Sequence, residues 1–234
     1  MAGNDRDDFE IVAGDDIRQP YSRTRGPNQP LQRTPKHSES LIVCLVRLLS
    51  PRNAVENWEL KMRKVTFGGG NSLDNFIARK DHAADWLSWN EEVASITAEL
   101  WKTIDTAVMG RKTYEALLRN GMTSYPDVKN YVFSRTIKES HAQEVEIIRE
   151  DAVKFVRKLK LQQGKGICVI GGGELAHSLF EANLIDEIGL NIHPVLLGSG
   201  IPLFHEMKQQ IDLELLDCKI LKNGCVVISY RVKH

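Results

Sequence analysis

An apolar run at residues 167–170 (ICVI) leads directly into Gly171-Gly172-Gly173-Glu174, and a helical pattern follows. A buried strand that delivers glycines to the start of a helix exposes backbone N–H groups with no Cβ in the way, and the helix dipole favours an anion there. This arrangement predicts a site for a pyrophosphate group. A tight turn without a ligand is the alternative, and the spacing differs from the GxGxxG of a standard Rossmann domain.

The composition of the chain changes near residue 60. Five of the eight prolines precede that point, and residues 18–40 mix Pro, Gln, Arg, Ser and Thr with almost no periodic apolar positions. Such a segment buries too little apolar surface to offset its ordering entropy. We therefore expect residues 1–61 to be a disordered extension and residues 62–234 to form one domain. Met62 directly precedes a strand pattern, so it is a candidate for the natural start of translation.

Strand and helix patterns alternate from residue 62 onward. Strand patterns lie at 64–67, 106–109, 131–133, 145–148, 167–170, 188–193, 213–221 and 226–232, and helical patterns lie at 93–104, 114–118, 152–159 and 175–180. The residues from Ser88 to Glu91 indicate a capping box before the first helix. This alternation predicts an α/β fold with a central, mostly parallel sheet and helices on both faces. The turn residues Lys222-Asn223-Gly224 predict that the last two strands form an antiparallel hairpin.

Two further strand patterns end in residues that suit phosphate. The strand at 106–109 runs into Gly110-Arg111-Lys112-Thr113, and the strand at 131–133 runs into Ser134-Arg135-Thr136. Each could be a solvated basic turn. However, ligands of open α/β sheets bind at the carboxyl ends of the strands, so three such ends together predict a site for a phosphate-bearing dinucleotide.

Six segments carry a resemblance to a known family. They read SLDNFIA at 72–78, MGRKTYE at 109–115, FSR at 133–135, VIGGG at 169–173, LIDE at 184–187 and PVLLGSG at 194–200, with Leu203-Phe204 following. In this order they resemble the reductase (C-terminal) domain of bifunctional riboflavin-biosynthesis enzymes and related stand-alone proteins of the dihydrofolate-reductase-like superfamily. The resemblance covers 62–234 and none of 1–61. The deaminase signature HxE…PCxxC is missing, so no deaminase is expected beside the reductase.

The resemblance implies a dihydrofolate-reductase-like fold and an NADPH-dependent reductase that transfers hydride to a small substrate. The nearest activity is that of 5-amino-6-(5-phosphoribosylamino)uracil reductase. Two alternatives remain: a dihydrofolate or pteridine reductase, and a dinucleotide-binding protein with little catalytic activity. An interaction module, in which the glycines only make turns, is a third reading.

The family assigns cofactor contacts to segments of this chain. By resemblance, Gly110, Arg111, Lys112 and Thr113 face the adenosine side and its phosphates, Ser134 and Arg135 flank the 2′-phosphate, Ile170, Gly171, Gly172, Gly173, Glu174 and Leu175 hold the pyrophosphate, and the 74–78 loop with Ile77 and Ala78 covers the nicotinamide.

The catalytic residues suggested by resemblance are Glu91 and Asp74, with Asp85 and Trp86 on the substrate side. Dihydrofolate reductases place an acid five residues after a Trp, and Trp86 and Glu91 have that spacing. The Leu-Pro that normally lies between them is absent, which argues against dihydrofolate as the substrate. Glu91 is equally explained as a capping acid, Glu92 and Asp85 are rival donors, and Asp74 is equally explained as the cap of its own turn. Arg79 and Lys80 could contact a substrate phosphate, although a solvated turn is the favoured role.

Charge and cysteine content predict a cytoplasmic protein with a small-molecule substrate. Lys plus Arg and Asp plus Glu both number 31, so no basic excess indicates nucleic-acid or membrane partners. The four cysteines form no CxxC pair and are expected to be reduced, buried thiols. The first residues are acidic, unlike a secretory signal, and the apolar residues 41–49 are too few to span a bilayer.

The histidines predict no metal site, and the hairpin predicts an interface. His177, His193 and His205 lack ligand spacing, and His193, before Pro194, is expected to end a strand. By analogy with the riboflavin branch, the apolar C-terminal hairpin could join two copies as a homodimer.

Overall fold

The structure is a computed structural model that describes residues 62–171 and 173–234. The expected N-terminal extension, including Cys44, and the predicted cofactor contact Gly172 lie outside the described residues. No helix in the described part of the chain is long and apolar enough to cross a membrane.

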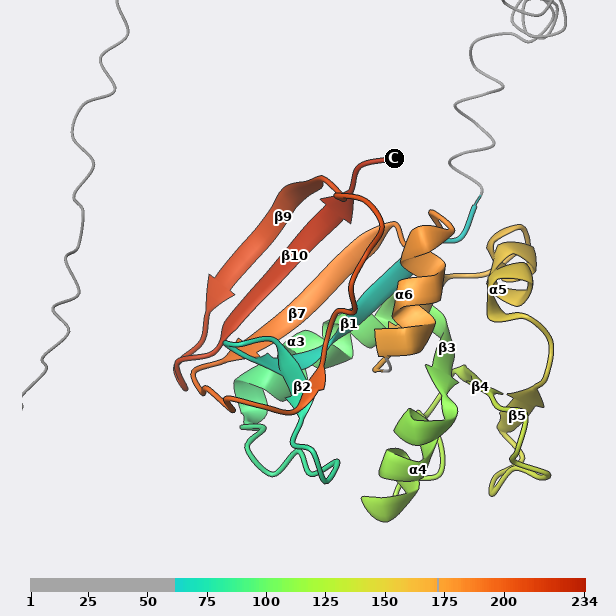
Figure 1. Ribbon diagram of the computed structural model, residues 1–234, viewed down its shortest axis with the longest axis horizontal. Coiled ribbons are helices and arrows are strands. Elements are labelled where there is room, and N and C mark those ends of the chain that lie inside the picture. Colours follow the sequence, from blue (N-terminus) through green and yellow to red (C-terminus); the bar gives the residue numbers. More distant parts are fainter. Residues whose placement is uncertain (1–61, 172) are drawn as a thin grey trace, which may run out of the picture. The chain divides into compact units, whose positions relative to one another are not determined.

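An eight-stranded sheet forms the centre of the described domain, with the strand order β5-β4-β3-β6-β1-β7-β10-β9 (Figure 1). The strands are β1 (Val65–Ser72), β3 (Ile104–Gly110), β4 (Lys129–Phe133), β5 (Val145–Ile148), β6 (Gly166–Ile170), β7 (Glu187–His193), β9 (Leu213–Ile220) and β10 (Val226–Val232). All strands from β5 to β7 in this order run parallel, whereas β10 is antiparallel to both β7 and β9. The predicted mostly parallel sheet with a C-terminal hairpin is confirmed.

Helices cover both faces of this sheet, as predicted. They are α3 (Glu91–Lys102), α4 (Arg111–Arg119), α5 (Ala152–Lys160) and α6 (Gly173–Glu181). Val108 of β3 packs in one cluster with Val156 of α5 and Leu179 of α6, whereas the next residue, Met109, packs with Tyr114 of α4. Because successive strand residues point to opposite faces, α5 and α6 cover one face and α4 covers the other. Figure 1 shows α3 on the far side of the sheet from α6.

The first strand is longer than predicted. The expected strand at 64–67 does not stop at the glycines but continues through them, and its pairing with β7 runs from Thr66 beside Glu187 to Ser72 beside His193. The reason is a close approach of two backbones. A Cβ added at Gly68 would lie 2.6 Å from the carbonyl oxygen of Gly189. Glycine in this strand therefore makes room and does not mark a turn.

The predicted capping box before α3 is wrong. The N-cap is Asn90, whose side chain accepts a hydrogen bond of 2.9 Å from the backbone N–H of Val93. The backbone N–H of Ser88 instead donates to the imidazole of His193, far along the chain. Asn90 is an equally good capping residue, and the helix begins after it, at Glu91.

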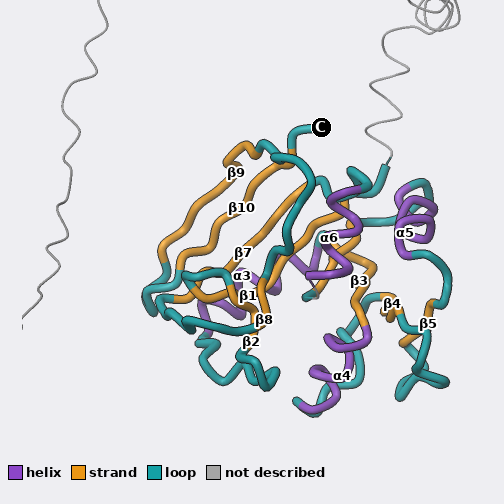
Figure 2. The backbone as a smooth tube through the Cα atoms, viewed as in Figure 1, coloured by secondary structure: helices purple, strands orange, loops and turns teal. Residues whose placement is uncertain are grey.

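A two-stranded ribbon of β2 (Phe76–Ala78) and β8 (Ile201–Pro202), which the patterns did not predict, lies beside the main sheet. It pairs the segment after β1 with the segment after β7 (Figure 2). The loops that follow these two neighbouring strands are therefore held together.

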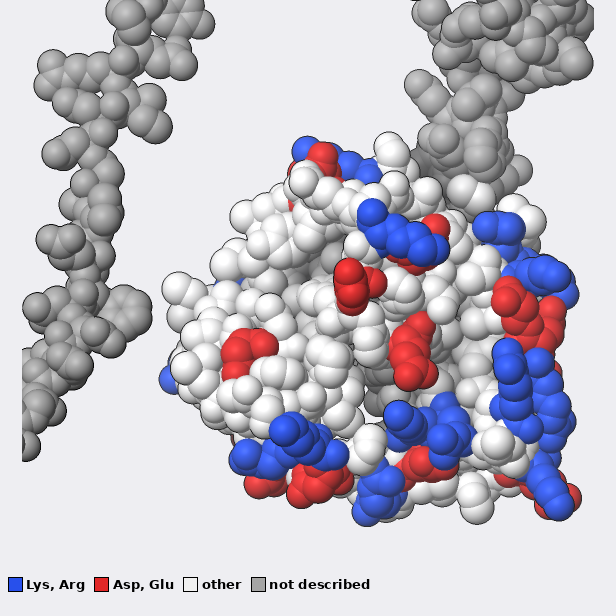
Figure 3. All heavy atoms as spheres, viewed as in Figure 1, with Lys and Arg blue, Asp and Glu red and all other residues white. Residues whose placement is uncertain are grey.

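The edge strand β9 is exposed along its whole length. Leu213, Leu215, Leu216 and Ile220 are among its exposed side chains. Cys218 is exposed as well, so the prediction of buried thiols holds for Cys168 and Cys225 but is wrong for this residue. Figure 3 shows that the visible surface over β9 and β10 is mostly uncharged.

Candidate functional site

The predicted phosphate segments meet at one edge of the sheet. Strands β4, β3 and β6 are direct neighbours and run parallel, so their carboxyl ends lie side by side. Strand β3 passes straight into α4, and β6 leads through the glycine turn into α6 (Figure 2). This edge therefore gathers two helix N-termini and the turn at Ser134.

The two glycine turns are in contact with each other. Gly171 has a φ of +57°, and a Cβ added there would lie 2.7 Å from the hydroxyl oxygen of Thr113 on α4. Gly110 is the N-cap of α4, makes no side-chain capping bond, and has open space where a Cβ would project. Gly173 is buried, and its absent Cβ makes room for the ring of His205 at 2.5 Å. A ligand can therefore approach the backbone at Gly110.

At the end of β4, serine and arginine have different roles. Ser134 is buried, and its hydroxyl oxygen accepts hydrogen bonds from the backbone N–H groups of Thr136 at 3.2 Å and Ile137 at 3.0 Å. It thus stabilises its own turn. Arg135 is exposed and is the charged group at this strand end.

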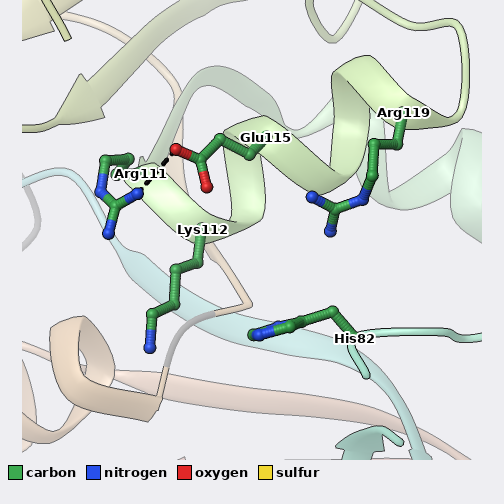
Figure 4. A pocket seen from close by; sticks show the side chains of 5 residues that line it. All are labelled: His82, Arg111, Lys112, Glu115 and Arg119. Carbon is green, nitrogen blue, oxygen red and sulfur yellow. Dashed lines mark hydrogen bonds and ion pairs between the residues drawn. The ribbon is translucent and has the colours of Figure 1, made fainter. Parts of the chain in front are cut away.

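A basic pocket lies beside the start of α4. Its cavity of about 200 Å³ is lined by His82, Arg111, Lys112, Glu115 and Arg119. Figure 4 shows four of these side chains projecting from α4 with His82 opposite them. Arg111 is paired with Glu115 at 2.7 Å, so one positive charge of this basic pocket is already partly neutralised.

Asp74 anchors the loop after β1. Its carboxylate accepts hydrogen bonds from the Ser72 hydroxyl at 2.6 Å and from the backbone N–H groups of Leu197 at 3.1 Å and Gly198 at 2.7 Å. The Ser72 hydrogen bond, helped by the two backbone donors, holds the pKa of Asp74 below its ordinary value. The side chain therefore stays ionised and fastens the 74–78 segment, with Ile77 and Ala78 half-buried in it, to the loop at 194–200.

The other three candidate acids lie apart. Asp85 is exposed and forms an ion pair with Arg79 at 2.9 Å, and the pKa of Asp85 is lowered by this partner. Glu92 accepts a hydrogen bond from the backbone of Lys222, which ties α3 to the C-terminal hairpin. Glu91 is the exposed first residue of α3, and its carboxylate makes no hydrogen bond with another described residue. Glu91 is thus the one of these three whose carboxylate is free within the described segment.

Sequence reasoning missed a polar cluster at the end of β7. His193 ends that strand, as expected, but it is also 2% exposed and touches the candidate substrate residue Trp86, the two rings meeting edge-on at 5.4 Å. The Asn191 amide lies 3.2 Å from Nε2 of His193, and Sγ of Cys225 lies 3.4 Å from Nδ1. Burial lowers the pKa of His193. The available signal was a pair of polar residues, two positions apart, in a strand that is otherwise apolar after its first residue, Glu187.

Within residues 62–171 and 173–234, no three His, Cys, Asp or Glu side chains are grouped closely enough to hold a metal ion. The indole Nε1 of Trp86 and the Oδ1 atoms of Asn71 and Asn191 are buried and lack a hydrogen-bond partner in this part of the chain. Buried polar atoms of this kind are uncommon, and they mark places where a ligand or a different amide orientation supplies the missing bond.

The sequence matches the family described as RibD C-terminal domain over residues 63–227. Two proteins of Bacillus subtilis (strain 168) are also similar to it. Uncharacterized protein YwjB is 37% identical over 150 residues, which is 63% of this chain and 86% of that protein. Uncharacterized protein YyaP is 33% identical over 186 residues, which is 73% of this chain and 96% of that protein.

Solved structures confirm the dihydrofolate-reductase-like fold. A putative riboflavin biosynthesis protein from Shewanella sp. PV-4 superposes with a TM-score of 0.65 at 24% identity and covers 73% of this chain and 99% of its own. A diaminohydroxyphosphoribosylaminopyrimidine deaminase/5-amino-6-(5-phosphoribosylamino)uracil reductase from Thermotoga maritima gives 0.59 at 13% identity, over 76% of this chain and 59% of its own. Dihydrofolate reductase from Enterococcus faecalis, complexed with NADP(H) and RAB-propyl, gives 0.53 at 17% identity, over 73% and 97%.

Proposed function

This chain belongs to the RibD C-terminal domain family, and we propose that it is an NADPH-dependent oxidoreductase that transfers hydride to a small heterocyclic substrate. The observation that carries the proposal is the meeting of β4, β3 and β6 at one sheet edge, where two helix N-termini and the exposed Arg135 lie together. We assign this activity to residues 62–234 as one domain.

The residues at this edge suit the cofactor. The open approach to Gly110 and the first turns of α4 and α6 offer backbone N–H groups to phosphate oxygens. In α6 the contribution of Glu174 and Leu175 is their backbone, because Leu175 is buried and Glu174 points to solvent. Bound NADPH supplies the hydride, and the chain orients it and excludes water. The anchored segment at 74–78 is the proposed cover of the nicotinamide.

Reduction of a C=N or C=O group also needs a proton. We propose Glu91 as its donor, because Glu91 is the candidate acid without a described partner, and we propose that Asp74 serves the reaction by anchoring the 74–78 loop. Asp85 and Trp86 belong to the substrate side, beside the ends of β1 and β7.

The substrate that we favour resembles 5-amino-6-(5-phosphoribosylamino)uracil. The family and the similarity to the Thermotoga maritima enzyme support this choice. A dihydrofolate or pteridine is the second candidate, supported by the likeness of fold to the Enterococcus faecalis enzyme. The basic pocket extends the positive charge at the start of α4 and suits a cofactor phosphate or a substrate phosphate.

A two-step experiment tests the proposal. Titration with NADPH should quench tryptophan fluorescence, since Trp86 lies beside the end of β7, and replacing Trp86 with Phe should remove most of the response. NADPH oxidation is then measured with the phosphoribosylaminouracil, dihydrofolate and a dihydropterin. NADPH oxidation with the phosphoribosylaminouracil, and with neither of the other two substrates, would support the favoured activity. Binding of NADPH without oxidation of any of the three would leave a dinucleotide-binding protein, and absence of binding would overturn the proposal.

A further inference from the structure

The hydrogen bonds around His193 fix which ring nitrogen carries the proton. The backbone N–H of Ser88 can only donate, and it approaches Nδ1 at 3.2 Å. The Cys225 thiol lies 3.4 Å from the same nitrogen. A neutral imidazole has one N–H and one lone pair, so the lone pair is on Nδ1 and the hydrogen is on Nε2. In an imidazolium, Nδ1 would also carry a hydrogen, and this donor would face the N–H donor of Ser88 with no acceptor between them.

This tautomer in turn fixes the Asn191 amide. The hydrogen on Nε2 needs an acceptor, and the Asn191 side chain is the group that lies 3.2 Å away. The oxygen and nitrogen of an amide have nearly the same shape, so the hydrogen-bond network decides their placement. Oδ1 therefore faces the ring, which gives this buried oxygen the partner that it otherwise lacks. The NH2 group of Asn191 then takes the opposite, buried position, where the oxygen finds no donor among the described residues.

The same ring holds a loop against the sheet. The segment from Trp86 to Ser88 is joined to the end of β7 by the Ser88 hydrogen bond and by the edge-on contact of Trp86 with His193. Gly70 of β1 leaves space at this junction: an added Cβ would lie 2.7 Å from Cδ2 of Leu87 and 3.4 Å from Nε2 of His193. Strands β1 and β7 and the loop before α3 thus converge on His193.

We propose that His193 is a positioning residue of the substrate site, and that it makes Asn191 a hydrogen-bond donor toward the substrate. The proposal rests on the function proposed above, because the loop it holds carries Asp85 and Trp86. Two side chains that contact this ring carry buried polar groups: Nε1 of Trp86 has no acceptor among the described residues, and the outer end of the Asn191 amide, which the NH2 group takes in this orientation, meets no described donor. A heterocycle that presents an acceptor oxygen or ring nitrogen would satisfy them.

The tautomer is tested by nitrogen NMR of the full protein with labelled histidine, with His193→Gln used to assign the signal. We expect a neutral ring protonated at Nε2 at neutral pH. A ring protonated at Nδ1, or an imidazolium, would overturn the inference. This measurement needs no substrate, so it stands even where no turnover is found.

The donor role is tested with Asn191→Asp, which keeps an acceptor toward Nε2 and removes the NH2 group. Asn183→Asp, at an exposed turn before β7, is the matched control for the added charge. We expect Asn191→Asp to weaken binding of 5-amino-6-(5-phosphoribosylamino)uracil in calorimetry by about 10- to 100-fold, since a buried substrate acceptor left without its hydrogen bond loses affinity on that scale. Affinity for NADPH should change less than about twofold.

Equal losses for substrate and cofactor, or no loss for either, would overturn the donor role. His193→Asn, which keeps an acceptor near Nδ1, should retain slow hydrogen exchange at the Ser88 amide, whereas His193→Leu should lose it. Fast exchange in both variants, or slow exchange in both, would overturn the positioning role. Failure of the wild-type protein to bind this uracil would contradict the proposed substrate and the donor role, and the NMR and exchange results would still decide the positioning role.

Discussion

Gly171 packs so closely against Thr113 that a Cβ added to Gly171 would lie 2.7 Å from the Thr113 hydroxyl oxygen. The contact joins the turn after β6 to the first turn of α4. Because Gly171 also has a left-handed φ of +57°, both backbone geometry and packing demand glycine there. Two segments that the sequence assigns separately to pyrophosphate and adenosine are therefore one packed unit.

Replacing Gly171 with Ala should destabilise the domain and weaken NADPH binding. A left-handed φ costs a non-glycine residue about 1–2 kcal/mol, and the collision with Thr113 adds to it. The double variant Gly171→Ala with Thr113→Ala should regain the steric part of the loss in urea denaturation. Gly69→Ala is the control, because open space surrounds its Cβ position. A Gly171→Ala protein as stable as the control would contradict the contact.

Substitutions at the N-cap of α3 and at the proposed acid beside it should have different effects, one on stability and the other on turnover. Asn90→Ala removes the hydrogen bond to Val93 and is expected to cost about 0.5–2 kcal/mol of unfolding free energy while turnover is kept. Glu91→Gln should leave stability and NADPH affinity unchanged but lower turnover about 10²- to 10⁴-fold, as for a pocket carboxyl that transfers a proton. Turnover of Glu91→Gln equal to that of the parent would remove Glu91 from the mechanism.

The sequence sufficed for the sheet because its apolar strands are short, regular and bounded by turn residues. The predicted end of β1 was wrong because glycine after a strand pattern is compatible with two structures: a turn, or a strand that packs closely against a neighbouring backbone. The pairing of Gly68 with Gly189 shows that the close approach is what occurs here. Local patterns could not predict it, because the two residues are more than a hundred positions apart.

The polar cluster could not be predicted for a related reason. Asn191 and His193 lie on one strand, but their partners Ser88 and Cys225 come from the loop before α3 and from the hairpin. Local patterns do not report such meetings. Strand ends were predictable because the carboxyl ends of neighbouring parallel strands share an edge, and this rule placed Gly110, Arg135 and Gly171 at or just after the ends of neighbouring strands.

Stability should fall in mild acid through His193. Burial lowers the pKa of this imidazole below its ordinary value of 6.5, so the unfolded state binds a proton at a higher pH than the folded state. The stability that neutral His193 contributes is fully present above about pH 6.5 and is lost as the pH falls through the folded-state pKa of this imidazole. Among its contacts Cys225 is the other titratable group, and burial raises the pKa of that thiol, so it stays neutral here.

The measurement is the unfolding free energy of wild type and His193→Gln between pH 5 and 8. The variant should show a shallower fall below about pH 6.5. Asp74 does not interfere, because its lowered pKa places the loss of its contribution below about pH 4, as the pH falls through the folded-state value. Parallel pH profiles for the two proteins would show that His193 is not the group that titrates.

Strand β9 is expected to join two copies of the chain. It is an edge strand with exposed leucines and an isoleucine, Ile220, that is 81% exposed. Edge strands of this kind pair with other chains unless charge or a cover prevents it. Ile220→Lys should shift the protein from dimer to monomer in analytical ultracentrifugation, with Lys219→Ala as a control on the same strand. A wild-type monomer at all concentrations would contradict this expectation.

The choice between NADPH and NADH should depend more on Arg135 than on Arg111. The 2′-phosphate is a dianion that suits the planar fork of an arginine. Arg111 is paired with Glu115 at 2.7 Å, whereas Arg135 is exposed and forms no ion pair within the described segment. A hydrogen bond to a charged group contributes about 1.5–3 kcal/mol, so Arg135→Ala should weaken NADPH about 10- to 150-fold and leave NADH nearly unchanged.

Glu115→Gln provides the matched control for Arg111, because it releases that guanidinium without removing it. Glu115→Gln should tighten NADPH binding and make that binding more dependent on salt. Arg111→Ala should lose less NADPH affinity than Arg135→Ala. Affinities of all three variants for both cofactors, measured by calorimetry at two salt concentrations, decide the point. An unchanged NADPH-to-NADH ratio in both Arg135→Ala and Arg111→Ala would place the 2′-phosphate elsewhere.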